Sequence, residues 1–138
     1  MTPEQVALVQ ASYAGLGTNG RELARQFYER LFESAPSVQT MFSEEPEAQA
    51  ELFLSELAVI VRSISQFDSF VPRARGLGAR HVAYGVNYSH YEIAGRVLLD
   101  AFAETLGSAF TQELHEAWRL AFDLVAETMM QGAADAGQ

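Results

Sequence analysis

The sequence contains no cysteine. This absence excludes disulfide bonds, zinc sites built from thiolates, iron–sulfur clusters and a nucleophilic thiol. It also excludes covalent haem of the c type, which is attached through a Cys-x-x-Cys-His motif. Any metal ion that the chain binds must therefore be held by nitrogen or oxygen atoms.

Positive charge and long apolar runs are also scarce. Nine Lys and Arg residues stand against eighteen Asp and Glu residues, which gives a net charge of −9. This balance argues against a nucleic-acid partner, because phosphate binding needs clustered cations. No run of 18 apolar residues is present, so we expect no membrane span. The N-terminus lacks the positive start and apolar stretch of a signal peptide, and we therefore expect a cytoplasmic protein.

The length and composition fit one folded domain. The chain has 138 residues, of which 49% are hydrophobic, enough for a buried core. We find no linker, no internal repeat and no sustained alternation of the kind that strands show. The sequence therefore predicts an all-α fold of about seven helices in a single domain over 1–138. Its last residues, about 133–138, are small and polar and are expected to fray.

Capping residues, prolines and glycines mark the expected helix ends. Thr2, Pro3 and Gln5 form the start of a first helix, with a capping box, that ends near Gly15. A second helix is expected from Thr18 or Asn19 to about Ser34. Further helices are expected from Pro36 to near Phe42, from Pro46 to about Gln66, within 67–83, from Asn87 or Ser89 to Gly107, and after Thr111.

Most catalytic motifs are missing. The chain has no His-Glu-x-x-His motif, no phosphate-binding loop and no Gly-x-Ser-x-Gly elbow. A di-iron bundle would need Glu three residues before His, and Gly78, Asn87 and Gln112 occupy those positions. His81 lies at the end of one helical pattern, and a neutral imidazole is a good ligand for iron, zinc or copper. A single His is nevertheless more often a surface or core residue.

Tyr28 and Gln49 are polar residues on otherwise apolar helix faces. Each has an ordinary explanation, as an amphipathic tyrosine and as an exposed residue at a helix start. A haem offers another explanation, because it needs an apolar slot, one axial nitrogen and an open sixth position. Phenol and amide donors could then stabilise a dioxygen ligand by about 1.5–3 kcal/mol without ionising near neutral pH. Spacing alone does not bring His81, Tyr28 and Gln49 together.

Several ordered segments carry a family resemblance. They are Phe27 to Phe32, Met41-Phe42, Gln49 with Phe53, Pro72 nine residues before His81, Arg80-His81, Tyr91 to Leu99, and Ala117-Trp118 with Phe122. Together they resemble the globins, and most closely the bacterial single-domain globins related to the haem domain of flavohaemoglobins. The resemblance covers nearly the whole chain and implies the globin fold around a haem pocket.

The resemblance implies roles for individual residues. They are His81 as proximal iron ligand, Phe42 against the haem face, Tyr28 and Gln49 as distal hydrogen-bonding residues, Phe53 in the distal pocket, and Tyr91 near the proximal side. Because the connector 43–48 varies in length among relatives, Ala48 or Leu52 is an alternative to Gln49. Arg80 could pair with a haem propionate, with Arg73 and Arg75 as alternatives.

Two departures from the flavohaemoglobin pattern bear on function. That pattern has a glutamate in the last helix near the proximal His, and the matching residue here is Ala133. Loss of this carboxylate weakens the polarisation of the His N–H and argues against strong peroxidase-like chemistry. The sequence also ends where a flavin and nicotinamide reductase would begin, so turnover that needs electrons would require a separate donor.

The implied function is that of a gas-binding haem protein. The resemblance implies non-covalent haem b that reversibly binds dioxygen or other diatomic gases, CO and NO among them. One alternative is a nitric oxide dioxygenase that works with a separate reductase. A haem-based gas sensor that signals through a partner is a further alternative.

Overall fold

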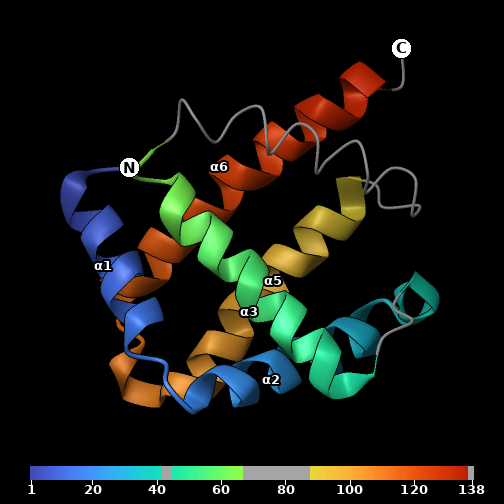
Figure 1. Ribbon diagram of the computed structural model, residues 1–138, viewed down its shortest axis with the longest axis horizontal. Helices are drawn as coiled ribbons and strands as arrows, with labels where there is room; N and C mark the ends of the chain where they lie inside the picture. Colours follow the sequence, from blue (N-terminus) through green and yellow to red (C-terminus); the bar gives the residue numbers. More distant parts are fainter. Residues whose placement is uncertain (42–44, 67–87, 137–138) are drawn as a thin grey trace.

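The structure is a computed structural model that describes residues 1–41, 45–66 and 88–136. Over these residues the chain forms five α-helices and two 3₁₀ helices, without strands (Figure 1). They are α1 (Pro3–Ala14), α2 (Asn19–Ser34), η1 (Pro36–Met41), α3 (Pro46–Ser63), α5 (Tyr88–Leu106), η2 (Gly107–Ala109) and α6 (Gln112–Ala136). The prediction of an all-α chain is thus confirmed. The helix expected within 67–83 lies outside the described residues.

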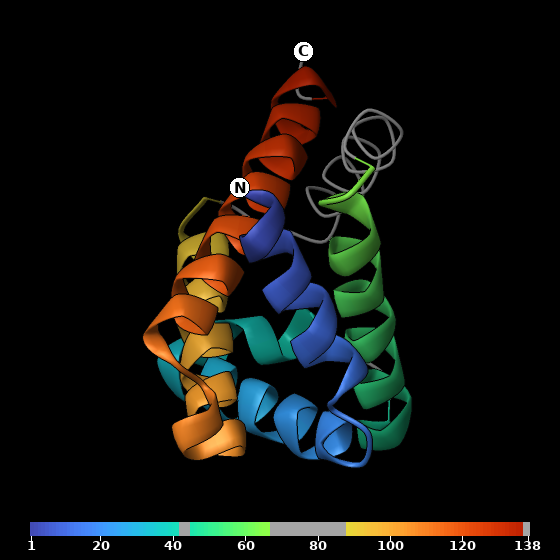
Figure 2. The same cartoon turned by 90° about the vertical axis from the view of Figure 1, so that its left-hand side faces the viewer.

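The helices cross one another around a shared core. Figure 1 shows α3 running across α5, and α1 beside the first half of α6. Seen from the side, α3 stands opposite α5 and α6, while α2 runs along the lower end of the molecule (Figure 2). Packing contacts join α2 to α5 and α3, and α6 to α1, α3 and α5. In the described part of the chain, no helix is both long enough and apolar enough to cross a membrane.

The predicted N-caps are present at the starts of the first and the last helix. The Thr2 hydroxyl accepts a hydrogen bond from the Gln5 backbone N–H at 3.1 Å, and the Thr2 N–H donates to the Gln5 side chain at 2.8 Å. The Thr111 hydroxyl likewise accepts from the Leu114 N–H at 3.2 Å. These bonds satisfy N–H groups that a helix start would otherwise leave without partners.

One helix type and two helix limits differ from the sequence-based ones. The segment from Pro36 is a 3₁₀ helix, and α3 ends at Ser63 rather than Gln66. The last helix extends to Ala136, past the position near 133 where the tail was expected to fray. Alanine has the highest helix propensity of any residue, and three of the residues 133–136 are alanine, which favours continuation of α6.

The core centres on the chain's single tryptophan. Trp118 and Phe102 are fully buried, and their ring centroids lie 4.5 Å apart. The ring of Phe110 stacks on Phe102 at 5.5 Å. The Trp118 indole N–H donates to the Ser12 hydroxyl at 2.8 Å, which satisfies the buried indole and joins α6 to α1.

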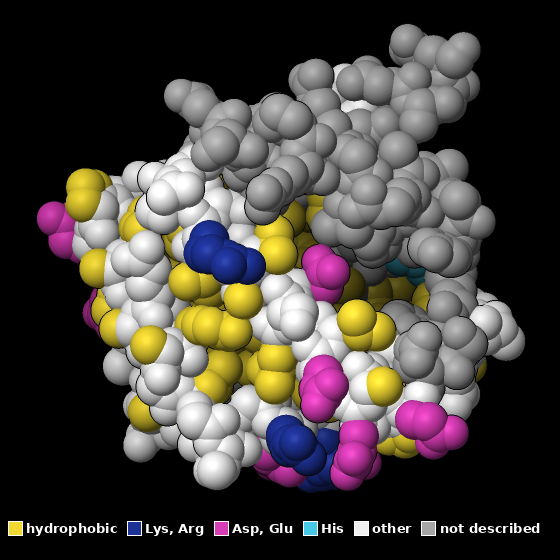
Figure 3. All heavy atoms as spheres, in the orientation of Figure 1, with side chains coloured by type: hydrophobic (Ala, Val, Ile, Leu, Met, Phe, Trp, Pro, Cys, Tyr) yellow, Lys and Arg dark blue, Asp and Glu magenta, His cyan; other side chains and the backbone are white. Residues whose placement is uncertain are grey.

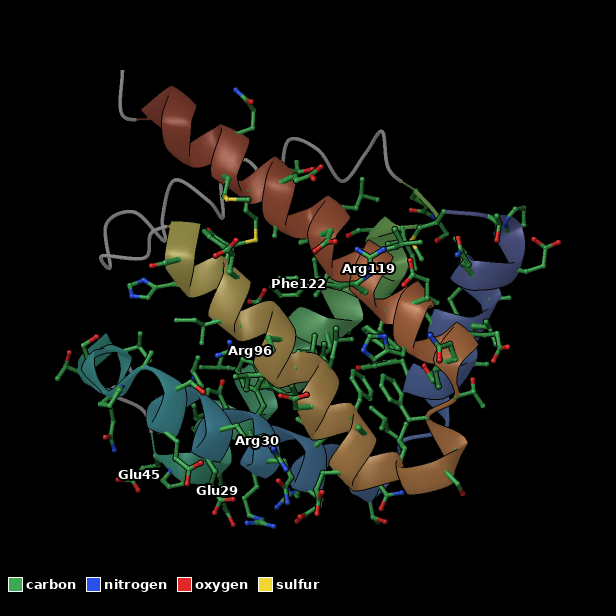
Figure 4. All side chains as sticks on the ribbon, turned by 180° about the vertical axis from the view of Figure 1, so that it is seen from behind. Glu29, Arg30, Glu45, Arg96, Arg119 and Phe122 are labelled. Atoms are coloured by element: carbon green, nitrogen blue, oxygen red, sulfur yellow. The ribbon has the colours of Figure 1, made fainter. Side chains whose placement is uncertain are left out.

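A glycine lets α5 and α6 approach closely. A Cβ atom built on Gly95 would lie only 2.8 Å from the Phe122 ring. In Figure 4, Phe122 lies between these two helices. A larger residue at position 95 would push the ring or the helices apart, so this position requires glycine for packing.

Candidate functional site

Tyr28 and Gln49 lie together, although 21 residues separate them in the sequence. Tyr28 projects from α2, and Gln49 belongs to the first turn of α3. The Gln49 side-chain Nε2 donates to the Tyr28 hydroxyl oxygen at 3.1 Å. The Tyr28 hydroxyl in turn donates to the Gln49 backbone carbonyl at 3.4 Å, a long contact for a hydrogen bond. The structure therefore pairs the two polar residues that the sequence singled out on apolar faces.

The helices that carry this pair hold it in place. On α2, Ala24 and Leu31 are buried, one turn to either side of Tyr28, so the tyrosine faces the interior. On α3, the Gln49 backbone N–H donates to the Glu45 carbonyl at 2.8 Å and closes the first turn. Gln49 is therefore fixed by helical geometry and not by a loose connector.

Aromatic rings surround the Tyr28 side chain. Phe53 lies one turn after Gln49, is only 7% exposed, and has its ring centroid 5.8 Å from that of Tyr28. Phe27 lies 4.8 Å from Phe53, and Phe32 lies 5.9 Å from Tyr28. The hydroxyl and amide thus sit beside an apolar wall, which is the setting in which a hydrogen bond is strongest.

The surroundings keep the Tyr28 phenol protonated. Burial raises the pKa of Tyr28 above its ordinary value of 10.0, and the carboxylate of Glu56 raises it further. The hydrogen bond from Gln49 opposes this rise in the pKa without cancelling it. At neutral pH the hydroxyl is therefore a hydrogen-bond donor.

Tyr91, on α5, is a second buried phenol. It is 9% exposed and packs in a cluster with Val125, Ala126 and Met129 of α6. Its hydroxyl oxygen has no hydrogen-bond partner in the described part of the chain, and burial raises the pKa of the phenol. Leaving such a group unsatisfied costs about 1–3 kcal/mol, so among the residues that the structure describes this hydroxyl has unused hydrogen-bonding capacity.

The predicted site residues fall into two groups. Tyr28, Gln49, Phe53 and Tyr91 are described, and the first three lie together. Phe42, Arg80 and His81 lie outside the described residues, as do the alternatives Arg73 and Arg75, so their roles stay predictions.

The alternatives to Gln49 are less suitable. Leu52 is 48% exposed, whereas Gln49 is in hydrogen-bond contact with Tyr28. Ala48 has no side-chain donor. Gln49 is thus the better candidate for a polar contact beside Tyr28.

The sequence reading missed one charged residue of this region, Glu56. The apolar stripe that begins at Gln49 drew attention to Phe53 and Leu57 and away from the acid between them. The spacing in the sequence nonetheless indicated its position, because Glu56 follows Gln49 by seven residues, or two helical turns, and therefore lies on the same face of the helix.

Comparison with known families gives the class of protein. The globin family model matches residues 25–129. The chain belongs to the globin family, and the resemblance found in the sequence is confirmed.

Two flavohemoproteins are among the curated relatives that the chain resembles. The chain is 31% identical to the flavohemoprotein of Deinococcus radiodurans over 99% of its own length and 36% of the relative. It is 32% identical to that of Chromobacterium violaceum over 94% of its length and 33% of the relative. The chain therefore spans about a third of the length of the curated relatives it matches.

Two solved structures share the fold. A bacterial globin from Campylobacter jejuni superposes with a TM-score of 0.84 at 24% identity, with 97% of each chain covered, and this likeness bears on fold alone. The other is an engineered carbene transferase based on a candidate nitric oxide dioxygenase from Rhodothermus marinus. It gives a TM-score of 0.80 at 29% identity, over 99% of this chain and 96% of that one.

The described residues fit a haem. Two neutral donors lie beside an aromatic wall, as a polar diatomic ligand in an apolar slot would require. The Tyr91 hydroxyl, which has no partner among the described residues, offers a further hydrogen bond from α5. None of these groups would compete with a histidine as an iron ligand, because both phenols remain protonated.

Proposed function

We propose that this globin binds haem b non-covalently and reversibly binds dioxygen and the other neutral diatomic gases, CO and NO. The observation that carries the proposal is the hydrogen bond between Gln49 and Tyr28, within a chain of the globin family. The names of the flavohemoprotein relatives support a haem in this fold.

Residues of this chain would hold the cofactor. His81 would supply the axial nitrogen, Phe42 would pack on the ring face, and Arg80 would pair with a propionate. Tyr91 would contribute on the side of the proximal histidine. When bound, the haem would supply an iron atom to which a diatomic gas can bind.

The distal pair would act through the Tyr28 proton. To donate to a ligand, the hydroxyl gives up its contact with the Gln49 carbonyl, and at 3.4 Å this contact is weak. Gln49 can keep donating to the same oxygen at 3.1 Å, which orients the phenol and polarises its O–H bond. The pair is therefore preorganised, and the change needed on ligand binding is a rotation of one hydroxyl.

A second candidate function is nitric oxide dioxygenation with a reductase in trans. The solved relative from Rhodothermus marinus favours it, as do the longer flavohemoprotein relatives. Against it, Ala133 occupies the position of the flavohaemoglobin glutamate, and among the described residues no carboxylate bonds to the Tyr91 hydroxyl. Reversible binding needs neither the reductase nor the carboxylate, and we therefore favour it.

Absorption spectroscopy of the purified protein tests the proposal. We expect haem bands that shift on addition of dioxygen and of carbon monoxide, and that return when the gas is removed. His81→Ala should abolish stable haem loading. A protein that takes up no haem, or a His81→Ala variant with full haem occupancy, would contradict the assignment.

A kinetic assay separates the two candidate functions. The haem-loaded protein is mixed with nitric oxide, dioxygen, NADH and a purified flavin reductase. We expect a single stoichiometric loss of nitric oxide. Sustained consumption over many equivalents would instead support the dioxygenase.

A further inference from the structure

Helix α3 carries an acidic residue on the face that bears the distal pair. Glu56 follows Gln49 by seven residues, and at 100° per residue it lies within about 20° of Gln49 around the helix axis. Phe53, which contacts the Tyr28 ring, lies between them on the same face. The Glu56 carboxylate acts electrostatically on the Tyr28 phenol, so its charge reaches the donors of the site.

Glu56 differs from six described acidic residues that lie near an arginine. Glu22 and Glu29 pair with Arg25, Glu116 and Asp123 pair with Arg119, Glu104 pairs with Arg30, and Glu47 lies 4.0 Å from Arg21. Glu56 is exposed and forms no hydrogen bond or ion pair in the described part of the chain. Its charge is therefore not neutralised by a neighbouring described cation.

A pocket with two donors and no charge would favour anions over neutral gases. Hydrogen bonds to an ionised acceptor are roughly twice as strong as those to a neutral one. Tyr28 and Gln49 alone would therefore favour azide, fluoride or nitrite over a neutral diatomic molecule. A negative charge beside the donors weakens that preference, because it repels an anion and leaves a neutral ligand almost unaffected.

We propose that Glu56 tunes ligand selectivity at the distal site, weakening the binding of anions so that the Tyr28 and Gln49 donors serve neutral gases. This role rests on the proposed haem site. Glu56 would contact neither the iron nor the ligand, and it would influence ligand binding through the electric field of its carboxylate. Figure 3 shows the face of the molecule over α3, where acidic side chains stand among hydrophobic ones.

The first test compares Glu56→Gln with a control, Glu51→Gln. Glu51 is also exposed on α3 but lies about 160° around the helix from Gln49. Azide and fluoride affinities of the ferric protein are measured by titration, with neutral imidazole as reference. Glu56→Gln should raise both anion affinities roughly fourfold, the effect of one charge at about 10 Å and an effective dielectric constant near 40. Imidazole and CO binding should stay within about twofold in both variants.

Equal anion affinities in the wild type and Glu56→Gln would overturn the proposal, as would the same increase in Glu51→Gln. The latter result would show a diffuse effect of net charge rather than a local one.

A second test does not depend on haem. NMR of isotope-labelled tyrosine follows ionisation of the Tyr28 phenol in the protein as purified, with Tyr28→Phe to assign the signal. Glu56→Gln should lower the pKa of this phenol, and Glu51→Gln should leave it unchanged. An unchanged pKa in Glu56→Gln would refute the electrostatic coupling even if the protein binds no haem. Lack of haem with a lowered pKa would instead contradict the proposed function alone.

Discussion

Replacing Tyr28 with Phe isolates the hydroxyl of the distal pair. The ring would keep its contacts with Phe53 and Phe32, because these involve no polar atom. The variant loses the 3.1 Å hydrogen bond from Gln49 and the donor that we assign to the ligand. A donor bond to a ligand that takes up charge contributes about 1.5–3 kcal/mol. At about 1.4 kcal/mol for each tenfold change, the dioxygen dissociation rate should rise tenfold or more.

The assay is stopped-flow replacement of dioxygen by carbon monoxide, followed by absorbance. Tyr13→Phe is a matched control, since it removes a phenol hydroxyl that donates to the Leu54 carbonyl at 3.3 Å on another helix pair. It should leave the dioxygen rate unchanged. If Tyr28→Phe retains haem and its dioxygen dissociation rate equals that of the wild type, Tyr28 does not contact the ligand. An equal increase in Tyr13→Phe would point to a general loosening of the fold.

Two further variants test packing and burial. Gly95→Ala should destabilise the fold by roughly 1–3 kcal/mol, because the added Cβ would overlap the Phe122 ring. Urea unfolding measures this loss of stability. Unchanged stability would show that α5 and α6 can separate freely. Tyr91→Phe should not destabilise the haem-free protein in the same assay, because the hydroxyl has no partner among described residues; a clear loss would reveal one. The raised pKa of Tyr91 has no effect on stability below pH 10.0, where the phenol is protonated in both states, but it favours unfolding as pH rises from 10.0 through the folded pKa, so Tyr91→Phe should unfold less readily at alkaline pH.

Local signals predicted the helix starts well. Thr2 and Thr111 cap their helices as expected, and α2 begins at Asn19 and ends at Ser34 as its pattern indicated. Such signals act over three or four residues, so neighbouring sequence is enough to read them. The 3₁₀ form of η1 and the early end of α3 depend on packing, which local propensity does not contain.

The distal pair shows where sequence reasoning needs more than periodicity. Helical spacing placed Tyr28 and Gln49 on apolar faces of separate helices, and the family resemblance predicted that they meet. The α2–α3 packing sets their 3.1 Å contact, and no pattern within either helix fixes it. Glu56 was missed for a related reason, since an isolated acid on a helix is usually only solvated and gains meaning from its neighbours in space.

The hydrogen bond from Trp118 to Ser12 allows tryptophan fluorescence to report on folding. The two residues are 106 positions apart, and Trp118 is the only tryptophan. Its indole loses this partner whenever α1 leaves α6, so the intrinsic fluorescence follows the meeting of the first helix with the last one. Fluorescence of the haem-free chain can therefore follow the docking of α1 on α6 without an introduced label.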